Sequence, residues 1–191
     1  MVKNEVKKMT FEYECTVYDL VAFNLYHNLN SATGRRQYLR LLYVVPVMVA
    51  VAYACSCHFL EMPFNTPVEI VAVLVPMLVF IPVYLAILPG IYRRKIRQLV
   101  TSMAREGHNR RLFGIHEVTL TKDGITDSGD YGHSFTRWHA IERVARTDEY
   151  AFVYVNTMSA IFIPRRAFAF PEEFEAFVDE ARRYHEEAAA S

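Results

Sequence analysis

The residues best suited to chemistry in this sequence are the soft ligands of one short run, Cys55-Ser56-Cys57-His58. Thiolates and imidazole suit Cu(I) or Zn²⁺. In a helix, however, residues two positions apart point about 200° away from each other, so Cys55 and Cys57 cannot easily grip one ion. Cysteine is also acceptable among the apolar residues of a membrane helix. We therefore interpret this run as part of such a helix and expect no metal site in it.

Four further histidines, His108, His116, His133 and His139, lie in the C-terminal part of the chain. They lack the paired spacing that a zinc site needs. The polar segment 127–132 lacks the oxygen-ligand register of a calcium loop. We expect surface or hairpin histidines and a polar hairpin turn here, with no metal and no cofactor.

Catalytic motifs are the next class of feature to consider. Serine, histidine and aspartate all occur, but the sequence contains no nucleophile elbow, no phosphate-binding glycine loop and no HExxH. We therefore expect a protein that is not an enzyme, with a hydrolase as a distant alternative. The net charge is zero, so no global field argues for nucleic acid.

Two basic clusters are the remaining candidates for binding. The first follows a long apolar run and consists of Arg93, Arg94, Lys95 and Arg97. Each basic residue near anionic lipid contributes on the order of 1 kcal/mol of attraction, so this cluster is a candidate lipid contact. The alternative is that these charges only set membrane topology. The second cluster, Arg165 and Arg166, is a candidate surface for a partner or ligand.

Two long uncharged stretches of the chain determine where the basic clusters lie. Leu41–Leu60 and Ile70–Tyr92 contain no Asp, Glu, Lys or Arg. Either one, as a helix, can cross a hydrocarbon core about 30 Å thick. We predict a transmembrane hairpin over residues 41–92, with spans at about 41–60 and 70–92.

The orientation of this hairpin follows from its flanks. Arg35, Arg36 and Arg40 precede the first span and the first basic cluster follows the second, whereas the loop Glu61–Glu69 has no Lys or Arg. Short flanks rich in Lys and Arg remain cytoplasmic. We predict a multi-pass protein of the cell inner membrane or plasma membrane, with both termini in the cytoplasm.

Prolines interrupt both spans. Pro46 lies near the start of the first, and Pro76, Pro82 and Pro89 punctuate the second. Prolines bend membrane helices and are tolerated there. They indicate either permanent kinks or a moving part of a transporter.

The N-terminal forty residues predict a short cytoplasmic strand and helix. Phe11–Cys15 alternates apolar and acidic residues, and Thr16 is a plausible N-cap for a helix that breaks at Asn30–Gly34. A strand this short is not stable alone, so we expect it to pair with a C-terminal sheet.

Residues 93–109 predict a basic amphipathic juxtamembrane helix. Ile96, Leu99, Val100 and Met103 recur at helical spacing, and Gly107 is a natural C-terminal cap. This segment extends the second span or lies on the membrane surface.

Residues 110–188 predict a small cytoplasmic domain. From Ile115 the apolar period changes to two and marks a series of short strands, in which Trp138 is expected to anchor the core. The last element returns to helical spacing, with one apolar stripe formed by Phe174, Phe177, Val178, Ala181 and Tyr184. Short antiparallel strands followed by one amphipathic helix predict a pleckstrin-homology-like antiparallel β-barrel capped by a C-terminal helix.

The chain resembles the YcxB-like family of bacterial membrane proteins, whose C-terminal domain is similar to bacterial pleckstrin-homology domains. Segments in the matching order and spacing cover nearly the whole chain: Phe23–His27, Gly34–Arg36, the two spans, Thr119–Ile125, Arg137–Val144, Phe162–Phe168 and Glu172–Phe177. The resemblance implies the fold, a bacterial cytoplasmic membrane and a binding or regulatory role. It implies no activity and no catalytic residues.

These observations together favour a membrane-anchored, non-enzymatic binding or scaffolding module. Its partners would be the lipid bilayer, a second copy of the chain or another protein, but not nucleic acid. The alternative is a component of a small oligomeric transporter or channel, which the prolines of the second span and the small residues Ala50 and Ala54 motivate.

Overall fold

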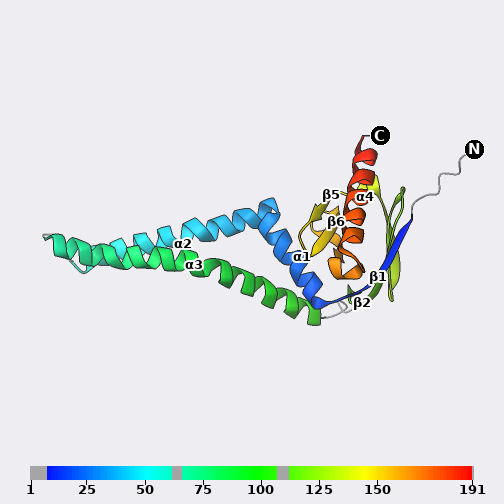
Figure 1. Ribbon diagram of the computed structural model, residues 1–191. Coiled ribbons are helices and arrows are strands. Elements are labelled where there is room, and N and C mark those ends of the chain that lie inside the picture. Colours follow the sequence, from blue (N-terminus) through cyan, green and yellow to red (C-terminus); the bar gives the residue numbers. More distant parts are fainter. Residues whose placement is uncertain (1–7, 62–65, 107–111, 191) are drawn as a thin grey trace, which may run out of the picture. The chain divides into compact units, whose positions relative to one another are not determined.

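The computed structural model describes residues 8–61, 66–106 and 112–190 (Figure 1). Its elements, in chain order, are β1 (Met9–Cys15), α1 (Val17–Asn30), α2 (Ala32–Phe59), α3 (Pro67–Arg105), β2 (Gly114–Leu120), β3 (Gly124–Gly129), β4 (Gly132–Arg137), η2 (Trp138–Ala140), β5 (Arg143–Arg146), β6 (Tyr150–Asn156), β7 (Ser159–Pro164), η3 (Arg165–Ala167) and α4 (Pro171–Ala189). The chain forms two compact units. The sheet domain combines the residues before Leu25 with those from Val100 on, and the hairpin unit is Leu25–Leu99.

The sheet domain holds two antiparallel sheets. One has the strand order β1-β2-β3-β4 and the other the order β5-β6-β7. β1 pairs with β2 along its whole length, from Met9 opposite Leu120 to Cys15 opposite Gly114. This confirms the prediction that the N-terminal strand joins a C-terminal sheet. The two long apolar helices are therefore inserted between two neighbouring strands.

The predicted closed barrel is wrong, because no backbone pairing joins the two sheets among the strands that the structure describes. After β4 the chain turns through η2, and β5 pairs only with β6. Side chains bridge the gap between β1 and β7 instead, since the Tyr13 hydroxyl donates to the Phe162 carbonyl at 2.7 Å. Trp138 is buried in η2 and its indole N–H donates to the Thr121 carbonyl at 2.8 Å. Its predicted role as a core anchor is confirmed.

The core of the sheet domain lies between the inner faces of both sheets and α4. Val118, Leu120 and Ile125 of the first sheet and Val153 and Ile163 of the second are fully buried. The predicted stripe of α4 is confirmed, since all of its members are buried: Phe174, Phe177, Val178, Ala181 and Tyr184. Burying each large apolar side chain stabilises the fold by about 1.5–3 kcal/mol.

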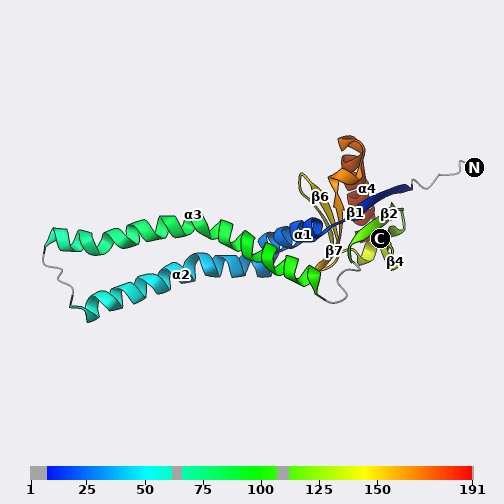
Figure 2. The same ribbon diagram turned by 90° about the horizontal axis from the view of Figure 1, so that it is seen from below.

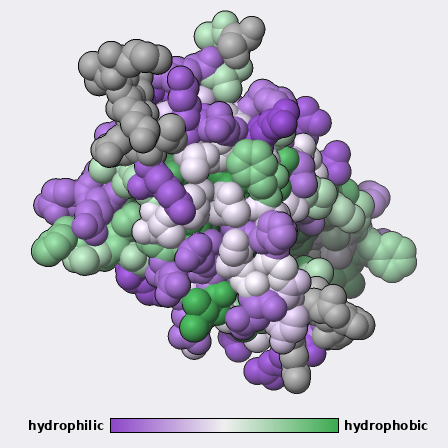
Figure 3. All heavy atoms as spheres, turned by 90° about the vertical axis from the view of Figure 1, so that its right-hand side faces the viewer, coloured by the Kyte–Doolittle hydropathy of each residue, from purple (hydrophilic) through white to green (hydrophobic). Residues whose placement is uncertain are grey.

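The four-stranded sheet lies at the right-hand edge of the sheet domain in Figure 1, and Figure 3 looks onto the molecule from that side. Hydrophilic residues and residues of intermediate hydropathy cover most of this view, with apolar side chains as scattered patches. The register places Thr10 beside Thr119 and Glu12 beside Glu117 on the outward face of β1 and β2. This face is therefore largely polar, as expected for a sheet with one face toward water, and Ile115 and Phe135 are exposed apolar side chains on it.

The hairpin unit contains α2 and the larger part of α3, which lie side by side in Figures 1 and 2. Both helices are long and apolar enough to cross a membrane. The Tyr38 and Tyr92 rings meet edge to face at 5.1 Å, and the Tyr84 hydroxyl donates to the Leu41 carbonyl at 2.6 Å. α3 remains one continuous helix through its three internal prolines, Pro76, Pro82 and Pro89.

The break between α1 and α2 is a single residue, Ser31. Its hydroxyl accepts the Gly34 N–H at 3.1 Å and caps α2. A Cβ at Gly34 would collide with the Asn28 carbonyl, so the tight turn requires glycine at this position. The predicted break at Asn30–Gly34 is thus narrower than expected, because Ala32–Phe59 is already helical.

The juxtamembrane segment is the last part of α3, which ends at Arg105. Tyr92, Ile96 and Val100 are buried, whereas Leu99 and Met103 are 62% and 50% exposed. The predicted stripe is therefore wrong at Leu99 and Met103, because the buried positions recur every four residues. The predicted cap Gly107 and the rest of the segment up to residue 109 lie outside the described residues.

Candidate functional site

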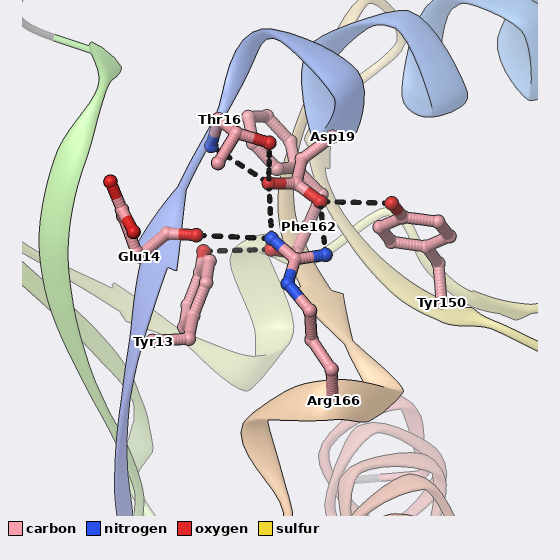
Figure 4. Close-up of polar contacts among 7 residues, drawn as sticks. All are labelled: Tyr13, Glu14, Thr16, Asp19, Tyr150, Phe162 and Arg166. Atoms are coloured by element: carbon pink, nitrogen blue, oxygen red, sulfur yellow. Dashed lines mark hydrogen bonds and ion pairs between the residues drawn. The ribbon is translucent and has the colours of Figure 1, made fainter.

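A densely bonded polar group of the sheet domain is the carboxylate of Asp19, in the first turn of α1 (Figure 4). Its side chain is fully buried. The guanidinium of Arg166, from η3, donates to it at two points, with Nη1 2.7 Å from Oδ1 and Nη2 2.6 Å from Oδ2. Such a two-point contact matches the planar fork of arginine to the planar carboxylate.

Three further hydrogen bonds reach the same carboxylate. The backbone N–H and hydroxyl of Thr16 donate to Oδ2 at 2.7 and 2.8 Å, and the Tyr150 hydroxyl donates to Oδ1 at 2.8 Å. Burial alone would raise the pKa of Asp19, but the hydrogen bonds from Arg166, Thr16 and Tyr150 outweigh it and hold this pKa below its ordinary value. Asp19 is therefore a paired, charged anchor.

Arg166 also binds the backbone of β1, at the edge that does not pair with β2. Its Nη2 donates to the Glu14 carbonyl at 3.0 Å, where a further strand would otherwise pair. Burial, together with the bond to Asp19, raises the pKa of Tyr150 to about 12, and burial likewise raises that of Tyr13. Both phenols are therefore neutral hydrogen-bond donors at physiological pH and not activated nucleophiles.

A hollow of about 480 Å³ adjoins this cluster. It is lined by Glu149, Tyr150, Pro164, Arg165, Arg166, Phe168, Ala169 and Pro171. The backbone N–H of Arg165 donates to the Glu149 carbonyl at 2.8 Å, while its guanidinium makes only a long contact of 3.4 Å with the Asp148 carbonyl. The two predicted arginines thus line one hollow but differ in role, because Arg166 is held by Asp19 and Arg165 can turn to a ligand.

The predicted lipid-contact residues Arg93, Arg94, Lys95 and Arg97 are exposed on α3. The contact between Tyr38 and Tyr92 places the start of α2 beside the part of α3 that carries these four residues. Seven exposed cations gather there, and we call them the basic collar: Arg35, Arg36, Arg40, Arg93, Arg94, Lys95 and Arg97. None has an ion-pair partner within the described part of the chain. A hollow of about 590 Å³ lies against Gly90, Arg93, Arg94, Arg97 and Gln98.

The other ligand-type residues do not converge. In α2, Cys57 is buried and Cys55 is exposed. Within residues 8–61, 66–106 and 112–190 no three His, Cys, Asp or Glu side chains are grouped to hold a metal.

Two of the predicted surface histidines, His133 and His139, are exposed. His108 lies outside the described residues. His116 lies in the hairpin of β2 and β3, where it is partly buried and paired with Asp127.

Asp19 was not identified as a candidate from the sequence. An acidic residue three positions after a threonine at the start of a helix is explained by capping alone. Its partner Arg166 lies 147 positions away. The only local signal is that Asp19 lies among the apolar positions that face the domain, between Cys15 and Val21, which are both buried.

The comparisons with known proteins support one of the predictions made from the sequence. Residues 120–181 match the family model described as YcxB-like protein, so the resemblance is confirmed over this segment. It runs from the last residue of β2 into α4 and includes Tyr150, Arg165 and Arg166, but not Asp19 or the basic collar. No curated protein and no solved structure matches the chain.

Proposed function

We propose that the protein is a non-enzymatic binding module anchored in the bacterial cytoplasmic membrane. The hairpin unit crosses the bilayer twice, and both termini and the sheet domain are cytoplasmic. The sheet domain is pleckstrin-homology-like and binds a protein partner, a second copy of the chain or lipid.

The observation that carries this proposal is an exposed apolar hairpin that ends in the basic collar. No residue in the most apolar 18-residue window of α2 or α3 is buried, as far as the structure describes them. Apolar patches of this extent are rare on soluble monomers, because water penalises them by about 25 cal/mol per Å². Lipid removes this penalty, and the collar fits the phosphate level of the inner leaflet, where lysine and arginine are favoured.

The layout of the sheet domain supports a pleckstrin-homology-like fold. A four-stranded and a three-stranded antiparallel sheet share one core with a C-terminal helix. The first strand of this domain precedes both spans, and the second follows them. The domain therefore cannot assemble without both ends of the hairpin, which suits a module that works at a membrane.

The hollow beside Arg165 and Arg166 supports a binding role for the sheet domain. Its walls include Tyr150, Pro164 and Phe168, and Arg165 retains free donors. Apolar walls with a few placed polar groups are typical of binding sites.

Two measurements test this function. Reporter fusions at the two termini and within the loop at 61–69 should place both termini in the cytoplasm and the loop outside. A photocrosslinking amino acid in place of Ala169 should capture one defined partner, a second copy or lipid from native membranes. Arg165→Glu should abolish this capture, whereas Arg182→Glu, at an exposed arginine of α4, should not. A strictly monomeric protein with no partner and no lipid preference would contradict the proposal.

A transporter or channel component is the alternative. Pro76, Pro82 and Pro89 within α3 favour it, since prolines can mark a moving segment of a membrane helix. Flux of small ions and solutes through liposomes that contain the purified oligomer tests it. A purified oligomer without flux eliminates this alternative and leaves the binding module in place.

A further inference from the structure

The hollow of about 590 Å³ in the hairpin unit is lined by one face of α3. It begins at Gly90, and its other residues follow three, four, seven and eight positions later, which is helical spacing: Arg93, Arg94, Arg97 and Gln98. All five are exposed. The volume falls in the range of about 300–1,000 Å³ that is typical of small-molecule sites. This face therefore offers three guanidinium groups to one ligand.

The packed side of α3 lies opposite this hollow. Leu88, Tyr92 and Ile96 are buried and recur every four residues. They are two positions out of step with Gly90 and Arg94, and residues two positions apart in a helix point about 200° away from each other. The hollow therefore faces outward from the hairpin, where lipid would surround it.

The arginines of this face have no acidic residue near them in the hairpin unit. That unit, Leu25–Leu99, contains two acidic residues, Glu61 and Glu69. The second of them lies at the start of α3, 24 positions before Arg93, which is about 36 Å along the helix. Arg93 and Arg97, four positions apart, repel each other. An anion from outside the unit would relieve this repulsion, and phosphate oxygens match the planar fork of arginine.

The exposed face continues into the apolar part of α3. Val83 and Ile87 lie seven and three positions before Gly90, and they are 49% and 51% exposed. One face thus joins an apolar strip to a group of arginines, as the chains and headgroup of an anionic lipid require. We propose that this face binds one anionic phospholipid, with its phosphate among the three arginines and its acyl chains along Val83 and Ile87. The site rests on the proposed function, since the hairpin must lie in a bilayer, and it adds a defined headgroup site to the diffuse attraction of the basic collar.

Native mass spectrometry of the full chain in detergent tests this site with phosphatidylglycerol and with phosphatidylcholine of the same acyl chains. The natural chain should bind phosphatidylglycerol about tenfold more tightly, because choline brings its own cation to the arginines. Arg94→Gln should weaken this binding about tenfold more than Lys95→Gln. Both substitutions remove one exposed charge of the basic collar, but Lys95 is not among the described residues that line the hollow. A diffuse attraction would make the two losses equal.

Gly90→Leu tests the shape of the site without a change of charge. A Cβ at Gly90 meets nothing within 4 Å, so the helix accepts a side chain there, and that side chain fills part of the hollow. The variant should keep its melting temperature in detergent but lose affinity for phosphatidylglycerol. Inorganic phosphate at millimolar concentration should not displace the lipid. Displacement would identify free phosphate as the ligand and overturn the lipid site.

The remaining outcomes separate this site from the proposed function. Equal losses in Arg94→Gln and Lys95→Gln, or unchanged binding in Gly90→Leu, overturn the site. If the reporter fusions still place both termini in the cytoplasm, the membrane anchor stands and the basic collar acts through its charge alone. If the fusions show no membrane crossing, the lipid cannot reach this face and both proposals fail.

Discussion

Asp19 and Arg166 lie 147 positions apart in the chain, yet they form a two-point ion pair at 2.6 and 2.7 Å around a fully buried carboxylate. One residue comes from the segment before α2 and the other from the segment after α3. The pair therefore joins the two parts of the chain that form the sheet domain. Its loss should affect the whole domain and not only one surface.

Arg166→Ala should destabilise the sheet domain by about 1–3 kcal/mol, because it removes the half-exposed cation that pairs with the buried Asp19 charge. Denaturant titration of the purified chain, followed by tryptophan fluorescence, measures this loss, since Trp138 is the single tryptophan and lies in the core. Arg165→Ala is the matched control and should change stability by less than about 0.5 kcal/mol. Equal effects of the two substitutions would mean that the ion pair is not the anchor.

The same pair predicts a loss of stability in acid. The folded pKa of Asp19 lies below its ordinary value, so its contribution is complete above the unfolded pKa of about 3.9 and is lost as the pH falls through the folded pKa. In Asp19→Asn this part of the acid limb should disappear, although the variant is less stable at neutral pH. Stability curves between about pH 2 and pH 7 compare the two. If the natural protein and Asp19→Asn lost the same amount of stability as the pH falls, Asp19 would not be the group responsible.

Local patterns were enough to predict much of the fold. The stripe of α4 and the alternation in β1 involve neighbours in the chain, so their periodicity identifies the buried faces. The pairing of β1 with β2 was also predictable, because an isolated strand of seven residues needs a partner.

Relationships between distant residues could not be predicted in the same way. Whether β1 meets β7 by backbone or by side chains depends on Tyr13 and Arg166, which no local pattern connects. For the same reason the sequence did not indicate that Arg166 binds Asp19 or that His116 pairs with Asp127. Their partners Asp19 and Asp127 become visible only with the register and the tertiary contacts.

Glu12 and Glu117 are directly opposite each other on the exposed face of β1 and β2. Like charges in this position repel, so Glu117→Thr should stabilise the sheet domain by about 0.2–1 kcal/mol. The gain should shrink as salt is added, because salt screens exposed charges. Glu186→Thr, on the exposed side of α4, is the control and should give no comparable gain. A destabilised Glu117→Thr variant would show that the glutamates do not limit the pairing.

Two glycines of the hairpin unit should respond in opposite ways to alanine. At Gly34 an added Cβ would meet the Asn28 backbone at the turn between α1 and α2, and backbone cannot give way as a side chain can. Gly34→Ala should therefore lower the melting temperature in detergent and reduce the monodisperse fraction. At Gly90, in α3, an added Cβ has nothing within 4 Å. Gly90→Ala should leave the protein intact and favour the helix by up to about 1 kcal/mol. If both variants behaved alike, the close turn at Ser31 would not be the constraint that holds α1 to α2.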